Sequence, residues 1–300
     1  MRSEPIATDD LARLRAARPD AAVDPTRSLF GPESITWRVN REATLLAGGG
    51  RALLLQIAHP LVAAGVEAYS DFRAHPLRRL WRTLDLMLTI VFADGAEALG
   101  AVRAIERVHA RVRGVLATDL GPFPRGTPYD AGDPTLLLWV HATLVDSAML
   151  VYDRFVAPLD PGARAAYYDE SRVVARLLGI PDRVVPADLG AFEEYVESMI
   201  SGPVLTVGSA AREIAAAIFR PAVPIVLRPA FVVSPFLTAG LLPARIRERY
   251  GLAWSPTRER ALAATAAVTR ALLPTVPAAL RFMPHARRAA AALQMTRQMS

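Results

Sequence analysis

Apolar residues recur at helical spacing through most of the chain. Segments 51–66, 79–92, 95–113 and 135–155 place apolar side chains every three or four positions, which is the period of an amphipathic α-helix. No segment of any length alternates apolar and polar residues as a half-buried strand does. The pattern predicts an all-α fold, a single globular domain of about ten helices.

Small and polar residues mark the predicted ends of these helices. Asp94-Gly95 joins two helices, and His59-Pro60 kinks or restarts another. Asp133-Pro134 opens the helix over 135–155, and Asp160 with Pro161 forms the start of the next, since Asp is a good N-cap and Pro suits the first helical position. Gly179 is expected to end that helix, and Asp188 is expected to start another.

Three segments fall outside regular helices. Residues 1–27 mix charged and apolar residues and predict a loose lead-in, and residues 114–134 are rich in Gly and Pro and predict a long loop. Residues 221–243 approach membrane-spanning length but contain five prolines and Arg228, so a buried or interfacial segment is favoured over a true span. The remainder, 245–300, is expected to be helical and basic.

Composition narrows the chemistry. The 300 residues carry a net charge of +6 and contain no Cys, which excludes disulfides, thiolate metal sites and Cys nucleophiles. Most arginines are scattered among acidic residues, without basic runs interleaved with aromatics, so no nucleic-acid partner is expected. The polar N-terminus does not resemble a signal peptide, and a cytoplasmic location is expected.

Histidines are the main candidate functional residues. His75 and His285 lie beside prolines in expected loops, whereas His59, His109 and His141 lie in apolar helical stretches. His109 falls at the edge of an apolar stripe, with Glu106 and Arg113 on the same predicted helix face. A metal-bound His with its oriented partner would have this pattern, and so would a buried His beside an ordinary surface ion pair.

Other patterns carry weaker signals. Arg79 and Thr83 share a helix face and suit anion binding or polarisation of dioxygen, or else form an ordinary basic surface turn. A hydrolase triad of His141, Asp146 and Ser147 lacks the G-x-S-x-G turn. Glu106-Arg-Val-His109 is a single Glu-x-x-His motif, whereas a di-iron bundle needs two. The Gly48–Gly50 run has no following Lys-Ser/Thr, so a turn between helices is favoured over a phosphate loop.

Six segments share an order and spacing with a known family. They are Ile57–Gly65, Arg79-Leu-Trp-Arg-Thr83, Val108–Gly114, Tyr129–His141, Tyr167–Glu170 and Leu178–Pro181. Together they resemble the latex-clearing-protein (rubber oxygenase) and MpaB-type haem oxygenase family. The likeness covers about residues 28–220, taken as the catalytic core, and is weak over 221–300, taken as an apolar segment and helices packed on that core.

The resemblance implies a globin-like core that binds one haem b. It implies that His109 is the iron ligand, that Arg79, Arg82 and Thr83 lie on the dioxygen-binding side, and that Arg113 and His141 lie near the haem. Rubber-cleaving members have a Lys in place of Arg82, able to cap the iron, and Arg is a poor iron ligand.

The implied function is activation of dioxygen for oxidation or cleavage of a C=C bond in a hydrophobic, isoprenoid-like substrate, with possible peripheral membrane contact. The alternatives are a non-catalytic haem- or lipid-binding helical protein and a helical structural protein without haem that is membrane-peripheral or associated with nucleic acid.

Overall fold

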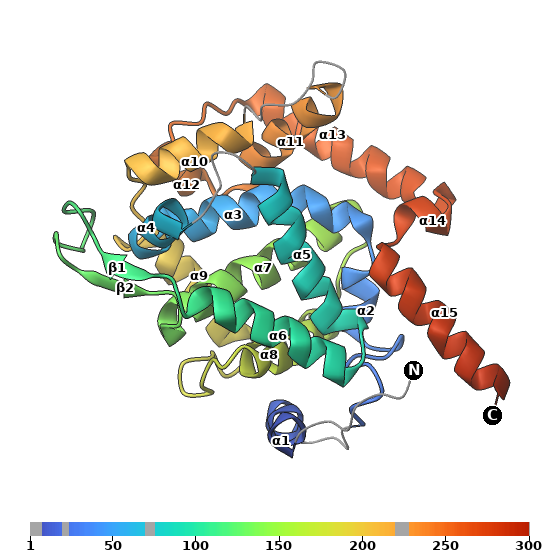
Figure 1. The fold of residues 1–300 in the computed structure, drawn as a ribbon. Helices are drawn as coiled ribbons and strands as arrows, with labels where there is room; N and C mark the ends of the chain where they lie inside the picture. The colour runs from blue at the N-terminus through green and yellow to red at the C-terminus, as the bar shows by residue number, and fades with distance from the viewer. Residues whose placement is uncertain (1–7, 20–23, 70–75, 220–227, 300) are drawn as a thin grey trace.

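The computed structural model describes residues 8–19, 24–69, 76–219 and 228–299, and these residues form a helical assembly (Figure 1). The all-α prediction is confirmed, with fifteen α-helices and a two-stranded sheet in the described residues. The globin-like arrangement of the core stays a prediction. The first half contains α1 (Thr8–Ala17), α2 (Ile35–Asn40), the 3-10 helix η1 (Ala43–Gly48), α3 (Gly49–Ala58), α4 (Pro60–Tyr69), α5 (Pro76–Phe92), α6 (Gly95–His109), β1 (Arg113–Val115) and β2 (Pro128–Asp130).

In the described residues of the second half, the regular secondary structure is helical. It contains α7 (Pro134–Phe155), α8 (Pro161–Leu177), α9 (Leu189–Ser201), α10 (Ser209–Phe219), α11 (Arg228–Leu241), α12 (Ala244–Arg249), α13 (Pro256–Leu272), the 3-10 helix η3 (Leu273–Thr275), α14 (Ala278–Arg281) and α15 (Pro284–Met299).

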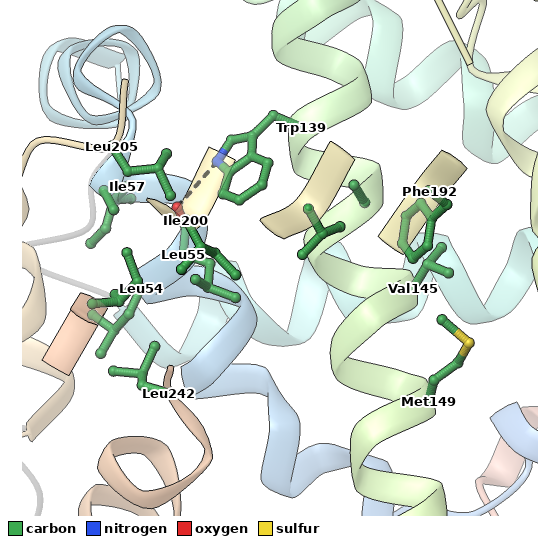
Figure 2. Close-up of a cluster of buried hydrophobic side chains, with 14 of the residues drawn as sticks. Leu54, Leu55, Ile57, Trp139, Val145, Met149, Phe192, Ile200, Leu205 and Leu242 are labelled. Atoms are coloured by element: carbon green, nitrogen blue, oxygen red, sulfur yellow. Dashed lines mark hydrogen bonds between the residues drawn. The ribbon is translucent and has the colours of Figure 1, made fainter. Parts of the chain in front are cut away.

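Helix α7 is the centre of the fold. It contacts η1, α2, α3, α8, α9 and α13, and its buried Trp139 donates from Nε1 to the Leu55 carbonyl of α3 at 3.1 Å (Figure 2). The main apolar cluster surrounds this contact and includes Val145, Met149 and Phe192. Burial of such side chains, at roughly 1.5–3 kcal/mol each, is the dominant favourable term in folding.

The predicted helix starts are confirmed by their capping bonds. The carboxylates of Asp94, Asp133, Asp160 and Asp188 each accept from a backbone N–H in the first turn of α6, α7, α8 and α9. Gly179 follows α8 with a φ of +78°, a left-handed conformation that Gly adopts without the steric cost of a Cβ.

The break at His59-Pro60 is also confirmed. The helical segment Ala43–Ala58, which consists of η1 and α3, is bent by 105° relative to α4. Of the described helices, only α7 is by itself long and apolar enough to cross a membrane, and 61% of its apolar window is buried inside the fold. Residues 221–227 lie outside the described residues, while Phe236 and Leu237 of α11 pack against the cluster around Phe155.

The expected loop over 114–134 contains the sheet that the periodicity did not predict. Strands β1 and β2 pair antiparallel, with Arg113 opposite Asp130 and Val115 opposite Pro128. Strands of three residues are too short to show an alternating pattern. The Gly48–Gly50 run, expected to be a turn, is instead the junction of η1 and α3.

Candidate functional site at the open end of the α5–α6 hairpin

Helices α5 and α6 form a hairpin whose arms start at Asp94. They contact each other, and in Figure 1 they diverge away from this turn, so that α6 ends toward β1. Arg79 and His109 are the same number of residues from Asp94 (94 − 79 = 109 − 94 = 15). At 1.5 Å per residue, each lies about 22 Å along its arm, so each is at the end of its arm that is away from Asp94.

Burial decreases along both arms of the hairpin. Near the turn, Ile90 and Leu99 are 0% and 1% exposed. At the open end, Trp81 and Val108 are 57% and 49% exposed, and Arg82, Thr83 and Arg107 are exposed as well. Three consecutive exposed residues on α5 cover most of a helical turn, so the described part of the chain does not pack around this part of the helix.

His109 is the last residue of α6. Its side chain is half-buried, and its carbonyl accepts from the Val112 N–H at 2.9 Å in the turn that ends the helix. Glu106, one turn earlier, accepts from Arg13 Nη2 of α1 at 2.5 Å. The sequence spacing placed the Glu106 carboxylate beside His109, and in the structure this carboxylate pairs with Arg13 of α1.

Arg113 does not continue this helix, so the prediction of a shared helix face with His109 was wrong. The chain turns after His109, and Arg113 begins β1, where its Nε lies 3.0 Å from Asp130 Oδ2. The Tyr69 hydroxyl at the end of α4 donates to the Arg113 carbonyl at 2.5 Å. Because Arg113 follows His109 by four residues, the two side chains still lie at one end of the molecule.

Helix α4 closes this end of the site. A Cβ on Gly65 would lie 3.0 Å from Val112 Cγ1, so the turn after His109 packs directly on α4. Burial raises the pKa of Tyr129, and the nearby Tyr69 and Glu67 act in the same direction. The ends of α4 and α6 and the two strands therefore bring together Glu67, Tyr69, Arg113 and Asp130.

The three predicted distal residues lie on one turn of α5. Arg82 and Thr83 have exposed side chains, and Arg79 lies one turn before Thr83 on the same helix, where only its backbone is described. This placement puts the Arg79–Thr83 turn on one arm of the hairpin and His109 on the other.

His141 belongs to α7 and lies deeper, where its side chain faces α8. It is 6% exposed, its imidazole hydrogen-bonds the Ser171 backbone, and its Nδ1 has no hydrogen-bond partner in the described residues. Burial lowers its pKa to about 4, so the ring is neutral at pH 7. The structure therefore places His141 in the helical core and Arg82 and Thr83 at the surface.

The remaining histidines have structural partners. Burial lowers the pKa of His59 to about 4, and its Nδ1 accepts from the Leu61 N–H at 3.3 Å. His285 was expected in an exposed loop but lies half-buried in the first turn of α15, with Nε2 2.9 Å from Asp85 Oδ1. His75 lies outside the described residues.

The weaker candidates do not form sites. Asp146 and Ser147 both accept from the buried Arg51, at 2.5 and 2.6 Å, rather than lying beside His141 as a triad. Within the described ranges, no group of three or more His, Asp or Glu side chains is placed to hold a metal ion. The single Glu-x-x-His motif of α6 therefore gains no further carboxylate or imidazole ligands from the described residues.

Comparison with known proteins identifies the family. Residues 37–271 match the model of the ER-bound oxygenase mpaB/B'/rubber oxygenase catalytic domain. The chain belongs to this family. Two relatives are each 28% identical over 220 residues, covering 69% of this chain and 80% of theirs: the uncharacterised protein Mb2261 of Mycobacterium bovis and the uncharacterised protein Rv2237 of Mycobacterium tuberculosis. No solved structure matches the chain.

The mpaB/rubber oxygenase domain extends further than the segments seen in the sequence. The match continues past residue 220 to 271, and so includes α11, α12 and almost all of α13. It ends before α14 and α15. The family assignment makes the protein a member of an oxygenase family and agrees with the resemblance on which the site residues were chosen.

Two residues of the open end were not singled out from the sequence. Asp130 holds the Arg113 guanidinium, and Tyr69 holds the Arg113 carbonyl. Asp130 lies within the Tyr129–His141 segment, but its partner depends on strand pairing, which no local pattern indicated. Tyr69 contacts a residue 44 positions away, and only the fold shows that contact.

Proposed function

We propose that the protein is a haem b-dependent oxygenase that activates dioxygen for oxidation or cleavage of a C=C bond in a hydrophobic, isoprenoid-like substrate. The proposal is supported by the family match over residues 37–271 and by the positions of the Arg79–Thr83 turn and His109 on the two arms of the α5–α6 hairpin. These are the positions at which the family resemblance expects the iron ligand and the dioxygen-binding side. Family membership supports the oxygenase class, and the hairpin supports the cofactor.

The residues at this end have the properties that a haem requires. A haem iron needs one axial side chain from the protein, and His109 is a half-buried imidazole outside the helical core. The exposed Trp81 and Val108 provide apolar surface for a macrocycle. The Arg113 guanidinium, oriented by Asp130, can pair with a propionate.

The bound haem would supply the redox chemistry with dioxygen, and the protein would supply ligation, polarity and substrate access. Arg79, Arg82 and Thr83 would donate hydrogen bonds to a polar diatomic molecule, since an arginine always carries donors and no acceptor. Glu67 on α4 is an exposed carboxylate near the same end and is the candidate base. His141, packed between α7 and α8, would support the core on which the hairpin rests.

Absorption spectroscopy tests the cofactor. Protein produced with sufficient iron is expected to show a Soret band, which His109→Ala should largely abolish. His285→Ala is the matched control, because it removes a half-buried imidazole that is bonded to Asp85 and leaves the expected ligand intact. A folded protein that stays colourless with added haemin, or a His109→Ala variant with an unchanged Soret band, would refute the proposal.

Oxygen uptake separates an oxygenase from a non-catalytic haem-binding protein. With isoprenoid alkenes of increasing length, the haem-loaded protein should consume dioxygen and yield oxygenated products. Arg79→Ala and Thr83→Ala should reduce this rate while retaining the Soret band, since neither residue is the expected ligand. Absence of uptake across the series, with a normal Soret band, would favour the binding protein.

A further inference from the structure

The net charge of the chain is concentrated near its C-terminus. Residues 243–300 contain ten Arg and two acidic residues, a net charge of +8, whereas residues 1–242 contain 25 Arg and 27 acidic residues, a net charge of −2. The scattering of arginines among acidic residues therefore holds for the first four-fifths of the sequence only. Helices α13, α14 and α15, which lie along one flank of the molecule, carry most of the excess (Figure 1).

The same flank exposes apolar side chains. Helix α13 buries Leu262 and Ala266 against the fold, and its opposite side is almost free of charged residues. Val268 and Leu272 are each 57% exposed, and Leu280 of α14 is 75% exposed. We call the exposed apolar residues of these two helices the C-terminal face: Ala261, Ala263, Ala264, Ala267, Val268, Ala271, Leu272, Ala278, Ala279 and Leu280.

The one acidic residue of α13 is already paired and does not oppose the charge of this face. Glu259 at the start of α13 accepts from Arg154 at 2.9 Å and from the Trp254 indole at 2.7 Å, and these two hydrogen bonds lower its pKa. Arg258 and Arg260 on the same turn are exposed, as are Arg287 and Arg288 of α15. Exposed arginines thus precede and follow the apolar residues of the C-terminal face along the chain.

The chemistry of this surface selects its partner. Contiguous exposed apolar surface marks an interaction site. A second copy of the same face would bring two strongly positive surfaces together, which is unfavourable, and the phosphates of a nucleic acid offer nothing to Val268, Leu272 or Leu280. An anionic bilayer attracts arginines at its headgroups and accepts apolar side chains at the acyl boundary.

We propose that the C-terminal face binds the surface of an anionic lipid bilayer, with α13 lying in the membrane plane. The exposed apolar side chains would enter the headgroup region, and Arg258, Arg260 and Arg288 would pair with lipid phosphates. The surface is separate from the α5–α6 hairpin and does not depend on haem. A protein that acts on a hydrophobic substrate would gain access to it at such a surface.

Vesicle co-sedimentation tests the proposal with the full chain. The protein is expected to sediment with vesicles that contain phosphatidylglycerol and much less with pure phosphatidylcholine vesicles. Replacing Arg260 and Arg288 with Gln should weaken binding to phosphatidylglycerol vesicles by about fivefold for each arginine. Val268→Asp with Leu272→Asp should abolish it, whereas the control Val115→Asp, at a 62% exposed position on β1, should leave it unchanged.

Circular dichroism of each variant distinguishes lost binding from lost folding, and all five substituted side chains are exposed. Equal sedimentation with both vesicle types, or full binding by the Val268/Leu272 variant, would overturn the proposal. So would a dimer in light scattering that Val268→Asp dissociates, since the occupant would then be a second copy. Release from vesicles by duplex DNA, together with DNA binding that Val268→Asp does not affect, would instead indicate a nucleic-acid surface. A normal Soret band in the membrane-deficient variant separates this result from the test of haem binding.

Discussion

Glu42 and Arg281 are 239 residues apart in the sequence and form a two-point ion pair. Arg281 Nη2 and Nε donate to the two carboxylate oxygens at 2.8 and 2.9 Å, and the Glu42 side chain is 1% exposed. The pair joins α14 to the segment before η1. A buried carboxylate is tolerated when it is paired and hydrogen-bonded, and is costly when it is not.

Arg281→Leu is expected to lower the free energy of unfolding by roughly 3–5 kcal/mol, because it leaves the Glu42 carboxylate without its two-point partner. Urea denaturation measures the effect. The control is Arg154→Gln, which breaks the more exposed pair with Glu259 and should cost no more than about 1 kcal/mol. Similar losses for the two variants would contradict this reading, and Glu42→Gln should restore part of the stability of Arg281→Leu.

Adjacent glycines of α3 should respond in opposite directions to alanine. A Cβ on Gly50 would lie 2.0 Å from Thr238 Oγ1 of α11, whereas a Cβ on Gly49 meets nothing within 4 Å. Gly50→Ala is expected to destabilise the fold by roughly 1–3 kcal/mol. Gly49→Ala should stabilise it by about 0.5–1 kcal/mol, because alanine loses less backbone entropy in a helix. Thermal unfolding of the two variants makes the comparison, and equal shifts in Tm would rule out the close helix contact.

Two buried histidines predict loss of stability in mild acid. Burial lowers the pKa of His59 and of His141 from 6.5 to about 4. In this window the unfolded chain binds protons that the folded chain does not, so stability decreases as the pH falls from about 6.5 toward 4. Each imidazole contributes up to about 1.4 kcal/mol per pH unit.

The slope between about pH 6.5 and 5 is the measurement, because most carboxylates remain ionised there. His59→Gln and His141→Gln should each have a shallower slope than the parent protein. A parent protein whose free energy of unfolding is constant over this range would show that neither ring is held neutral.

Arg82→Lys tests the distal arm of the hairpin and rests on the proposed haem. A lysine amine can lose its proton and bind iron, whereas an arginine stays protonated. The variant is therefore expected to show a Soret band that shifts as the pH rises toward the lysine pKa, about 10.4 in free solution. The parent protein should show no such shift.

The matched control is Arg103→Lys on α6, where the arginine pairs with Asp10 of α1 at 2.5 Å. This second lysine would be held away from the open end and should leave the band unchanged at every pH. A shift in both variants would indicate a general effect of pH on the protein, and a shift in neither would place residue 82 out of reach of the iron.

Local signals in the sequence were sufficient for the helix boundaries. An aspartate before an apolar periodic run identified the starts of α7, α8 and α9, because a cap forms within three residues of its own position. The same reasoning failed after His109. In the sequence the apolar stripe continues through Val112, but in the structure α6 ends at His109 and Arg113 begins β1, which pairs with β2.

Long-range partners could not be predicted. Arg51 is 4% exposed and binds Asp146, Ser147 and the Leu241 carbonyl, residues 95, 96 and 190 positions away. In a chain rich in arginine, no local feature separates this residue from a surface arginine. For the candidate site, the equal distances of Arg79 and His109 from Asp94 could be counted in the sequence, but the divergence of the two arms could not.

The ion pair between Glu42 and Arg281 also shows that the family match and the folded domain have different ends. The family match runs from residue 37 to 271, so it contains the carboxylate but not the arginine that neutralises it. A chain that ended at residue 271 would contain the whole family match but would lack the arginine that pairs with the buried Glu42 carboxylate. The last helices of this protein therefore contribute to the stability of the whole fold, although they lie outside the family match.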